Sequence, residues 1–164
     1  MAEIDSTAGP ANANDPEGIS SNPFNGDIYI TDGKDGAQQV VIFDKDLNYK
    51  SSFSYGDRMD DAEAIVYDPV SGNLLLSSFG DGGLFEYTLG GTFIKKLSFD
   101  GLSPDPIDLQ GLSFGPTSNP NDAPSNRALY ISDLGEDNHP DGGVYEVLVA
   151  SSVPHTDPTI SKVS

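Results

Sequence analysis

Asp61-Ala62-Glu63-Ala64-Ile65 is the stretch that decides the fold, because it occurs in three versions along the chain. Asp15-Pro16-Glu17-Gly18-Ile19 begins 46 residues before it, and Asp108-Leu109-Gln110-Gly111-Leu112 begins 47 residues after it. Further apolar segments follow each version in the same order. A period of this length indicates one structural unit repeated in tandem.

Each repeat contains four short segments that are typical of β-strands, being rich in Ile, Val, Leu, Tyr and Phe and bounded by Gly, Asp, Asn or Pro. No apolar pattern of helical period runs through them. A longer loop over 115–126 lengthens the third repeat, and its fourth strand, at 159–163, is the weakest match. After each opening segment, strands are expected over 27–32, 39–43 and 49–53, over 73–78, 83–87 and 93–97, and over 128–133, 143–147 and 159–163.

Four antiparallel strands repeated about every 45 residues form the blade of a β-propeller. The sequence therefore predicts an all-β protein with three four-stranded antiparallel blades, half of a six-bladed propeller, with a β-sandwich as the alternative. The expected divisions are an N-terminal extension over 1–14, which could add a strand to a neighbouring blade, and blades over 15–57, 58–104 and 105–164.

Three blades do not close a ring, since propellers have roughly four to eight. An open arc leaves apolar faces and sheet edges in water, and these invite pairing with another chain. We therefore expect a homodimer that completes six blades or a higher assembly, unless the chain is part of a longer propeller.

The composition narrows the possible partners. Acidic residues outnumber basic ones by 26 to 8, giving a net charge of −18. Nucleic acids and anionic membranes are excluded as partners, because both bind clustered Lys and Arg. The chain has no Cys, no apolar run near the roughly 20 residues that span a bilayer, and no recognisable secretion signal at its start.

Acidic residues recur at two places in the repeat, before the first strand and in the loop between the second and third strands. Blade topology brings both places to one face of the disc, where crowded carboxylates must bind protons or share cations. Ca²⁺ takes six to eight oxygen ligands in flexible geometry. The candidate calcium ligands are Asp15, Glu17, Asp32, Asp61, Glu63, Asp81, Asp108, Asp133, Asp137 and Asp141.

Two other interpretations of these acids remain open: a solvated loop surface, and adaptation to strong salt. Lys34 and Arg58 fall on the same face and could hold an anion beside the metal, so a small anionic or sugar ligand is possible. No Gly-x-Ser-x-Gly elbow, phosphate-binding loop or dinucleotide fingerprint occurs, and no catalytic residue is assigned.

The repeat also resembles a known group of proteins. Asp-x-Glu-Gly-Ile, a Gly-containing hairpin, an apolar strand and Gly142-Gly143-Val144-Tyr145-Glu146 are similar to the secreted bacterial six-bladed propellers of the NHL-like, SdiA-regulated and phytase-like families. The resemblance covers about residues 15–150. It implies a propeller fold, an extracellular or cell-surface location, and a calcium-binding role for Glu63 and Asp61. The phytases carry Lys and Arg around their phosphates, whereas this chain has few bases.

Three functions follow as hypotheses. The first is a non-catalytic, calcium-binding propeller module that acts as a binding or assembly unit. The second is a calcium-dependent hydrolase of phosphoesters or esters, in which the metal activates water. The third is a structural subunit of an extracellular fibre or surface layer.

Overall fold

The computed structural model describes residues 12–99, 108–123, 126–135, 141–149 and 160–163. These residues form three four-stranded antiparallel sheets, so the predicted all-β fold is confirmed. Within the described ranges no helix is long and apolar enough to cross a membrane. The strands are β1 (Pro16–Ser21), β2 (Ile28–Asp32), β3 (Gln39–Phe43) and β4 (Tyr49–Ser54); β5 (Ala64–Tyr67), β6 (Leu74–Ser77), β7 (Gly83–Tyr87) and β8 (Phe93–Ser98); β9 (Leu109–Pro116), β10 (Arg127–Asp133), β11 (Gly143–Val149) and β12 (Ile160–Val163).

Strand burial follows the composition of each segment. All residues of β6 and β7 are buried, as expected for apolar strands covered on both faces, whereas β4 and β8 expose most of their residues. Tight hairpins join the strands, and Gly26, Gly72 and Gly91 occupy their positive-φ positions. The short apolar strand segments and the turn residues between them thus give each sheet its simple up-and-down strand order.

The third repeat differs from the prediction at its first loop. Gly115 and Pro116 belong to β9, where they pair with Ala128 and Arg127, so the connection is shorter than the sequence suggested. Pro116 is tolerated because it ends the strand. The weakly predicted fourth strand is present as β12, whose backbone pairs with β11 from Val144↔Val163 to Val147↔Ile160.

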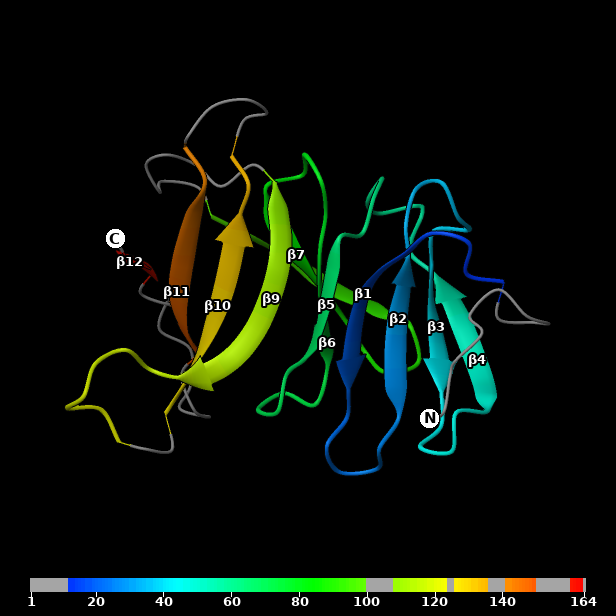
Figure 1. Cartoon of the computed structure of the whole chain (residues 1–164), viewed down its shortest axis with the longest axis horizontal. Coiled ribbons are helices and arrows are strands. Elements are labelled where there is room, and N and C mark those ends of the chain that lie inside the picture. The colour runs from blue at the N-terminus through cyan, green and yellow to red at the C-terminus, as the bar shows by residue number, and fades with distance from the viewer. Residues whose placement is uncertain (1–11, 100–107, 124–125, 136–140, 150–159, 164) are drawn as a thin grey trace.

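The sheets pack face to face around two apolar cores. In the first core Tyr29, Val40 and Ile42 of the first sheet meet Leu74, Leu76, Phe85 and Tyr87 of the second. In the second core Val66, Leu75 and Leu84 of the second sheet meet Leu129, Ile131, Tyr145 and Val147 of the third. The opening strands β1, β5 and β9 are the inner strands and lie in the middle, while β4 and β12 lie at the two ends (Figure 1).

Close backbone approach joins the inner strands. A Cβ on Gly18 would lie 2.8 Å from Ala64 Cα and 2.9 Å from Ile65 N, so only glycine fits where β1 crosses β5. Hydrogen bonds add to the contact between sheets. Tyr67 N donates to Ser20 Oγ at 2.9 Å, and Ser77 Oγ donates to Leu109 O at 2.6 Å.

Candidate cation-binding rim

Five acids mark the starts of the inner strands and are called the acidic rim below: Asp15, Glu17, Asp61, Glu63 and Asp108. The same backbone bond ties each start to the loop after the second strand of its own sheet. The donors are Gly33 N to Asp15 O at 2.7 Å, Phe79 N to Asp61 O at 3.0 Å, and Leu134 N to Asp108 O at 2.9 Å. The two acidic places of the repeat therefore share one face, as the sequence predicts.

Asp15 and Asp61 come close together although they belong to different sheets. Asp15 Oδ2 and Asp61 Oδ1 each lie 2.9 Å from the position that a Cβ on Gly33 would occupy, and Glu17 Cγ lies 3.0 Å from it. Lys34 N donates to Asp61 Oδ1 at 2.8 Å, and Asp35 N donates to Asp15 Oδ2 at 3.0 Å. The loop at Gly33 thus bridges the first two sheets through their rim carboxylates.

The surroundings of the rim raise the pKa of both of its glutamates. Desolvation, and to a smaller extent the negative charges of Asp61, Glu17, Asp108 and Asp15, together raise the pKa of Glu63 from 4.5 to about 7. The pKa of Glu17 is also raised, first by desolvation and then by Asp15. A glutamate that titrates near neutral pH is a common sign of a functional site.

The rim fits calcium in its donor chemistry, because all its side chains offer carboxylate oxygens. Among the residues that the structure describes, no group of three or more such side chains is already arranged to hold a metal ion. One oxygen of Asp15 and one of Asp61 already accept backbone N–H groups. Glu17 already lies within hydrogen-bond reach of Asp15, so binding would use the remaining carboxylate oxygens of the rim after a rearrangement of its side chains.

Asp32 and Asp133 lie beneath the rim, and their carboxylates bind backbone amides. Asp32 Oδ1 accepts Asp15 N at 2.9 Å, and Asp133 Oδ1 accepts Asp108 N at 2.9 Å. Both side chains are buried, Asp32 completely. In the second sheet the equivalent position is Ser78, whose hydroxyl donates to Asp81 Oδ2 at 2.6 Å. These aspartates hold the loops that form the rim.

The remaining predicted calcium ligands lie in different surroundings. Asp81 accepts the hydrogen bond from the Ser78 hydroxyl, and Asp141 lies beside Gly135 in the third sheet. Asp137 lies outside the described residues. Asp35, a rim neighbour absent from the predicted ligand set, is brought in by its backbone bond to Asp15 and by its charge, which acts on Glu17. Asp35 belongs to the acidic loop between the second and third strands of the first repeat, so its place in the repeat was the signal that pointed to it.

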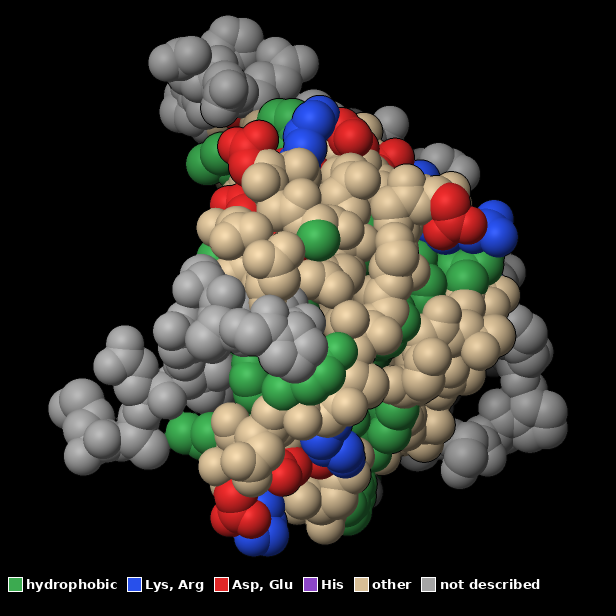
Figure 2. Space-filling view, turned by 90° about the vertical axis from the view of Figure 1, so that its right-hand side faces the viewer, with side chains coloured by type: hydrophobic (Ala, Val, Ile, Leu, Met, Phe, Trp, Pro, Cys, Tyr) green, Lys and Arg blue, Asp and Glu red, His purple; other side chains and the backbone are tan. Residues whose placement is uncertain are grey.

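The two basic candidates are already paired. Lys34 Nζ binds Asp60, and the Arg58 guanidinium lies 4.9 Å from the centre of the Phe93 ring. Acidic and basic side chains gather at the upper and lower ends of the first sheet's side of the molecule, with uncharged surface between them (Figure 2). Lys50 of β4 lies toward one of these ends, where it pairs with Asp27.

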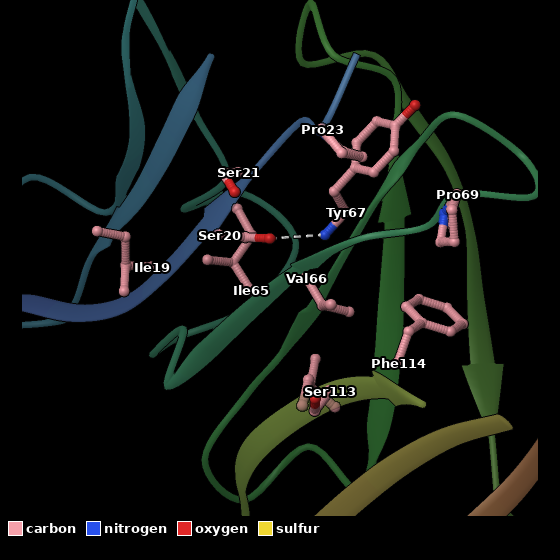
Figure 3. Close-up of a pocket in the computed structure, with 11 residues that line it drawn as sticks. Ile19, Ser20, Ser21, Pro23, Ile65, Val66, Tyr67, Pro69, Ser113 and Phe114 are labelled. Carbon is pink, nitrogen blue, oxygen red and sulfur yellow. Dashed lines mark hydrogen bonds between the residues drawn. The ribbon is translucent and has the colours of Figure 1, made fainter. Parts of the chain in front are cut away.

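A groove of about 400 Å³ lies across the inner strands, below the rim, and no sequence pattern indicated it. Its walls come from all three sheets, and Tyr67 and Phe114 extend into the region shown in Figure 3. Ser20 and Tyr67 join β1 to β5 within it. The lining residues are Ile19, Ser20, Ser21, Pro23, Ile65, Val66, Tyr67, Pro69, Leu112, Ser113 and Phe114.

Comparison with known proteins supports the fold. No family model matches the chain, and no curated protein matches it by sequence. A luciferin-regenerating enzyme is similar in structure, with a TM-score of 0.59 and 17% identity over 86% of this chain. Sqt1 of Saccharomyces cerevisiae has a TM-score of 0.48, 12% identity and 81% coverage of this chain, and streptogramin B lyase has 0.48, 19% and 80%.

This chain spans 47% of the length of the luciferin-regenerating enzyme, 32% of Sqt1 and 39% of streptogramin B lyase. These neighbours are β-propeller folds, and the likeness to the luciferin-regenerating enzyme extends over most of this chain. The three sheets of this protein are therefore blades of a β-propeller.

Proposed function

We propose that this protein is an extracellular, calcium-binding β-propeller module that serves as a binding or assembly unit. The observation that carries the proposal is the acidic rim, where Asp15 and Asp61 from two blades lie together and the pKa of Glu63 reaches about 7. A bound divalent cation would offset both the desolvation and the neighbouring negative charges that raise the pKa of Glu63.

The rim favours this function over a hydrolase of phosphoesters. An anionic substrate would approach a face whose net charge is negative, and the nearby Lys34 is already paired with Asp60. Calcium alone, or calcium together with an uncharged group such as a sugar hydroxyl, meets no such barrier. The uncharged groove beneath the rim offers a surface on which a ligand could rest.

Thermal melting in calcium and in chelator tests the proposal. Calcium at about 100 times its Kd should add about 2.7 kcal/mol to the native state, and so raise the melting temperature by about 5–10 °C. Asp61→Asn should lose most of this rise, because it removes a rim charge while its amide oxygen can still accept Lys34 N.

Asp46→Asn is the matched control, because Asp46 lies in the exposed β3–β4 hairpin beside Lys45. It should respond to calcium like the unchanged protein. An equal rise in magnesium, or an equal rise in both variants, would mean that calcium acts on general surface charge and would refute a rim site.

A further inference from the structure

Equivalent positions in the three blades differ sharply in exposure at the two ends of the arc. Val40, Leu84 and Val144 occupy the same place in β3, β7 and β11, and they are exposed by 0%, 1% and 46%. The first two are covered by the blade that follows. Val144 belongs to the last blade, on the face turned away from the second blade, which we call the trailing face.

The opposite end of the arc shows the same effect. Ile19 and Ile65 are equivalent positions of β1 and β5, with exposures of 67% and 3%. Ile65 packs into the core between the first two blades, and its counterpart Leu112 packs against the core between the second and third. Ile19 pairs with Ile30 and lies on the face of the first blade turned away from the second, the leading face.

We propose that a second copy of this chain covers both end faces, the leading face of each copy packing on the trailing face of the other. The chain itself shows twice how a leading face covers a trailing face, in its two internal cores. Two arcs of three blades related by a twofold axis give six blades, which is within the range of closed propellers.

The shape of the arc suits this arrangement. The first and third sheets extend to opposite sides in Figure 1, and the second lies between them and packs on the far face of each. Their outward faces therefore point the same way, so one partner can cover both at once. The groove across β1, β5 and β9 would then be enclosed between the two copies.

The polar side chains of Glu146 and Tyr130 on the trailing face already have hydrogen-bond partners within the chain. Glu146 accepts hydrogen bonds from Ser118 N at 2.7 Å and from the Ser118 hydroxyl, and the residue is buried, with only 3% of its surface exposed. The Tyr130 hydroxyl donates to Pro116 O at 2.7 Å. Covering this face would therefore bury apolar Val144 and Leu148 without leaving a carboxylate unpaired.

On the leading face, Ile30, Val41 and Phe43 already form a small core with Ala13. Ala13 lies two residues before Asp15, as Met59 lies two residues before Asp61, and Met59 is buried in the core between the first two blades. The segment that approaches the first blade thus sits where the connection between two blades normally sits. The chain's own Ala13 therefore already covers part of the leading face, and Ile19 is the apolar residue left exposed for the partner to cover.

Sedimentation velocity over a concentration series, in calcium and in chelator, tests the proposal. The expected species has twice the mass of the 17.3 kDa chain. Val144→Asp and Ile19→Asp should each weaken pairing about 100-fold or more, because each buries a charge in an apolar contact. Ile94→Asp is the matched control, since Ile94 is 43% exposed on β8, the outer strand of the second blade, whose two faces the other blades already cover, and it should pair normally.

Mixing the two variants identifies the mode of pairing. A Val144→Asp chain keeps its leading face and an Ile19→Asp chain keeps its trailing face, so the mixture should recover a dimer with one intact interface. Circular dichroism melting checks that each variant folds. A 17.3 kDa monomer at all concentrations, a filament, or a mixture that stays monomeric would overturn the proposal, whatever the calcium experiment shows.

Discussion

Replacing Glu63 with Gln should stabilise the protein at alkaline pH when calcium is absent. The folded state raises the pKa of Glu63 from 4.5 to about 7, so the folded state holds a proton that the unfolded chain releases between these values. Stability should therefore be full below about pH 4.5, fall as the pH rises toward 7, and stay at its lower level above that.

The magnitude follows from the size of the pKa difference and the exposure of the side chain. Converted in full, the difference between 4.5 and about 7 corresponds to about 3 kcal/mol. Glu63 is only half-buried, so water screens part of the interaction and we expect about 1 kcal/mol. Glu63→Gln removes the charge and keeps the shape of the side chain. The free energy of unfolding of this variant should therefore exceed that of the unchanged protein by about this amount at pH 8 and equal it at pH 4.

Urea denaturation at several pH values between 4 and 8, in chelator, measures the effect. Asp46→Asn removes one negative charge far from the rim and controls for the net charge of −18. The interpretation of the rim is wrong if Glu63→Gln and Asp46→Asn have the same pH profile, or if Glu63→Gln is the less stable of the two at pH 8.

Two further predictions concern the contacts that hold the blades. Gly18→Val should lower the stability by about 3 kcal/mol, because its Cβ would meet backbone atoms of Ala64 and Ile65. Gly90→Ala is the control, because a Cβ there has no atom within 4 Å and should change the stability little; equal effects in thermal melting would contradict the close packing of β1 on β5. Tyr55→Phe should cost about 1–2 kcal/mol, because Tyr55 Oη donates to Asp32 O at 2.6 Å, while Tyr87→Phe should be nearly neutral, because the buried Tyr87 hydroxyl has no hydrogen-bond partner among the described residues. A larger loss for Tyr87→Phe in urea denaturation would show that its hydroxyl is satisfied in solution.

The blades could be predicted from the sequence because the signals that define each strand and turn are local. Apolar strand segments, turn residues and the Asp-x-Glu or Asp-x-Gln opening each depend on a few neighbouring residues, and the opening recurs in all three repeats. Even the weak match at the fourth strand of the third repeat corresponds to β12. The loop predicted over 115–126 begins later, because Gly115 and Pro116 still pair with β10 and a proline is tolerated at a strand end.

The direction of the acidic side chains could not be predicted in the same way. Asp32 and Asp15 are both rim candidates by position, yet Asp32 turns inward to the Asp15 amide. Ser78 at the equivalent place was the available signal, since serine and aspartate share the ability to bind loop backbone but differ as metal ligands. Open apolar end faces follow from three blades that do not close a ring, but the residues that they expose could not be predicted. The exposure of Ile19 and Val144 depends on which sheets neighbour them, and no local pattern contains that.

The bond from Lys34 N to Asp61 Oδ1 gives the rim a mechanical consequence. The amide belongs to a turn of the first blade and the carboxylate to the second, so this one bond joins neighbouring blades through a side chain of the rim. The placement of the first blade against the second thereby depends in part on a single carboxylate acceptor, and its loss would loosen this joint while the ladder of each sheet stays intact.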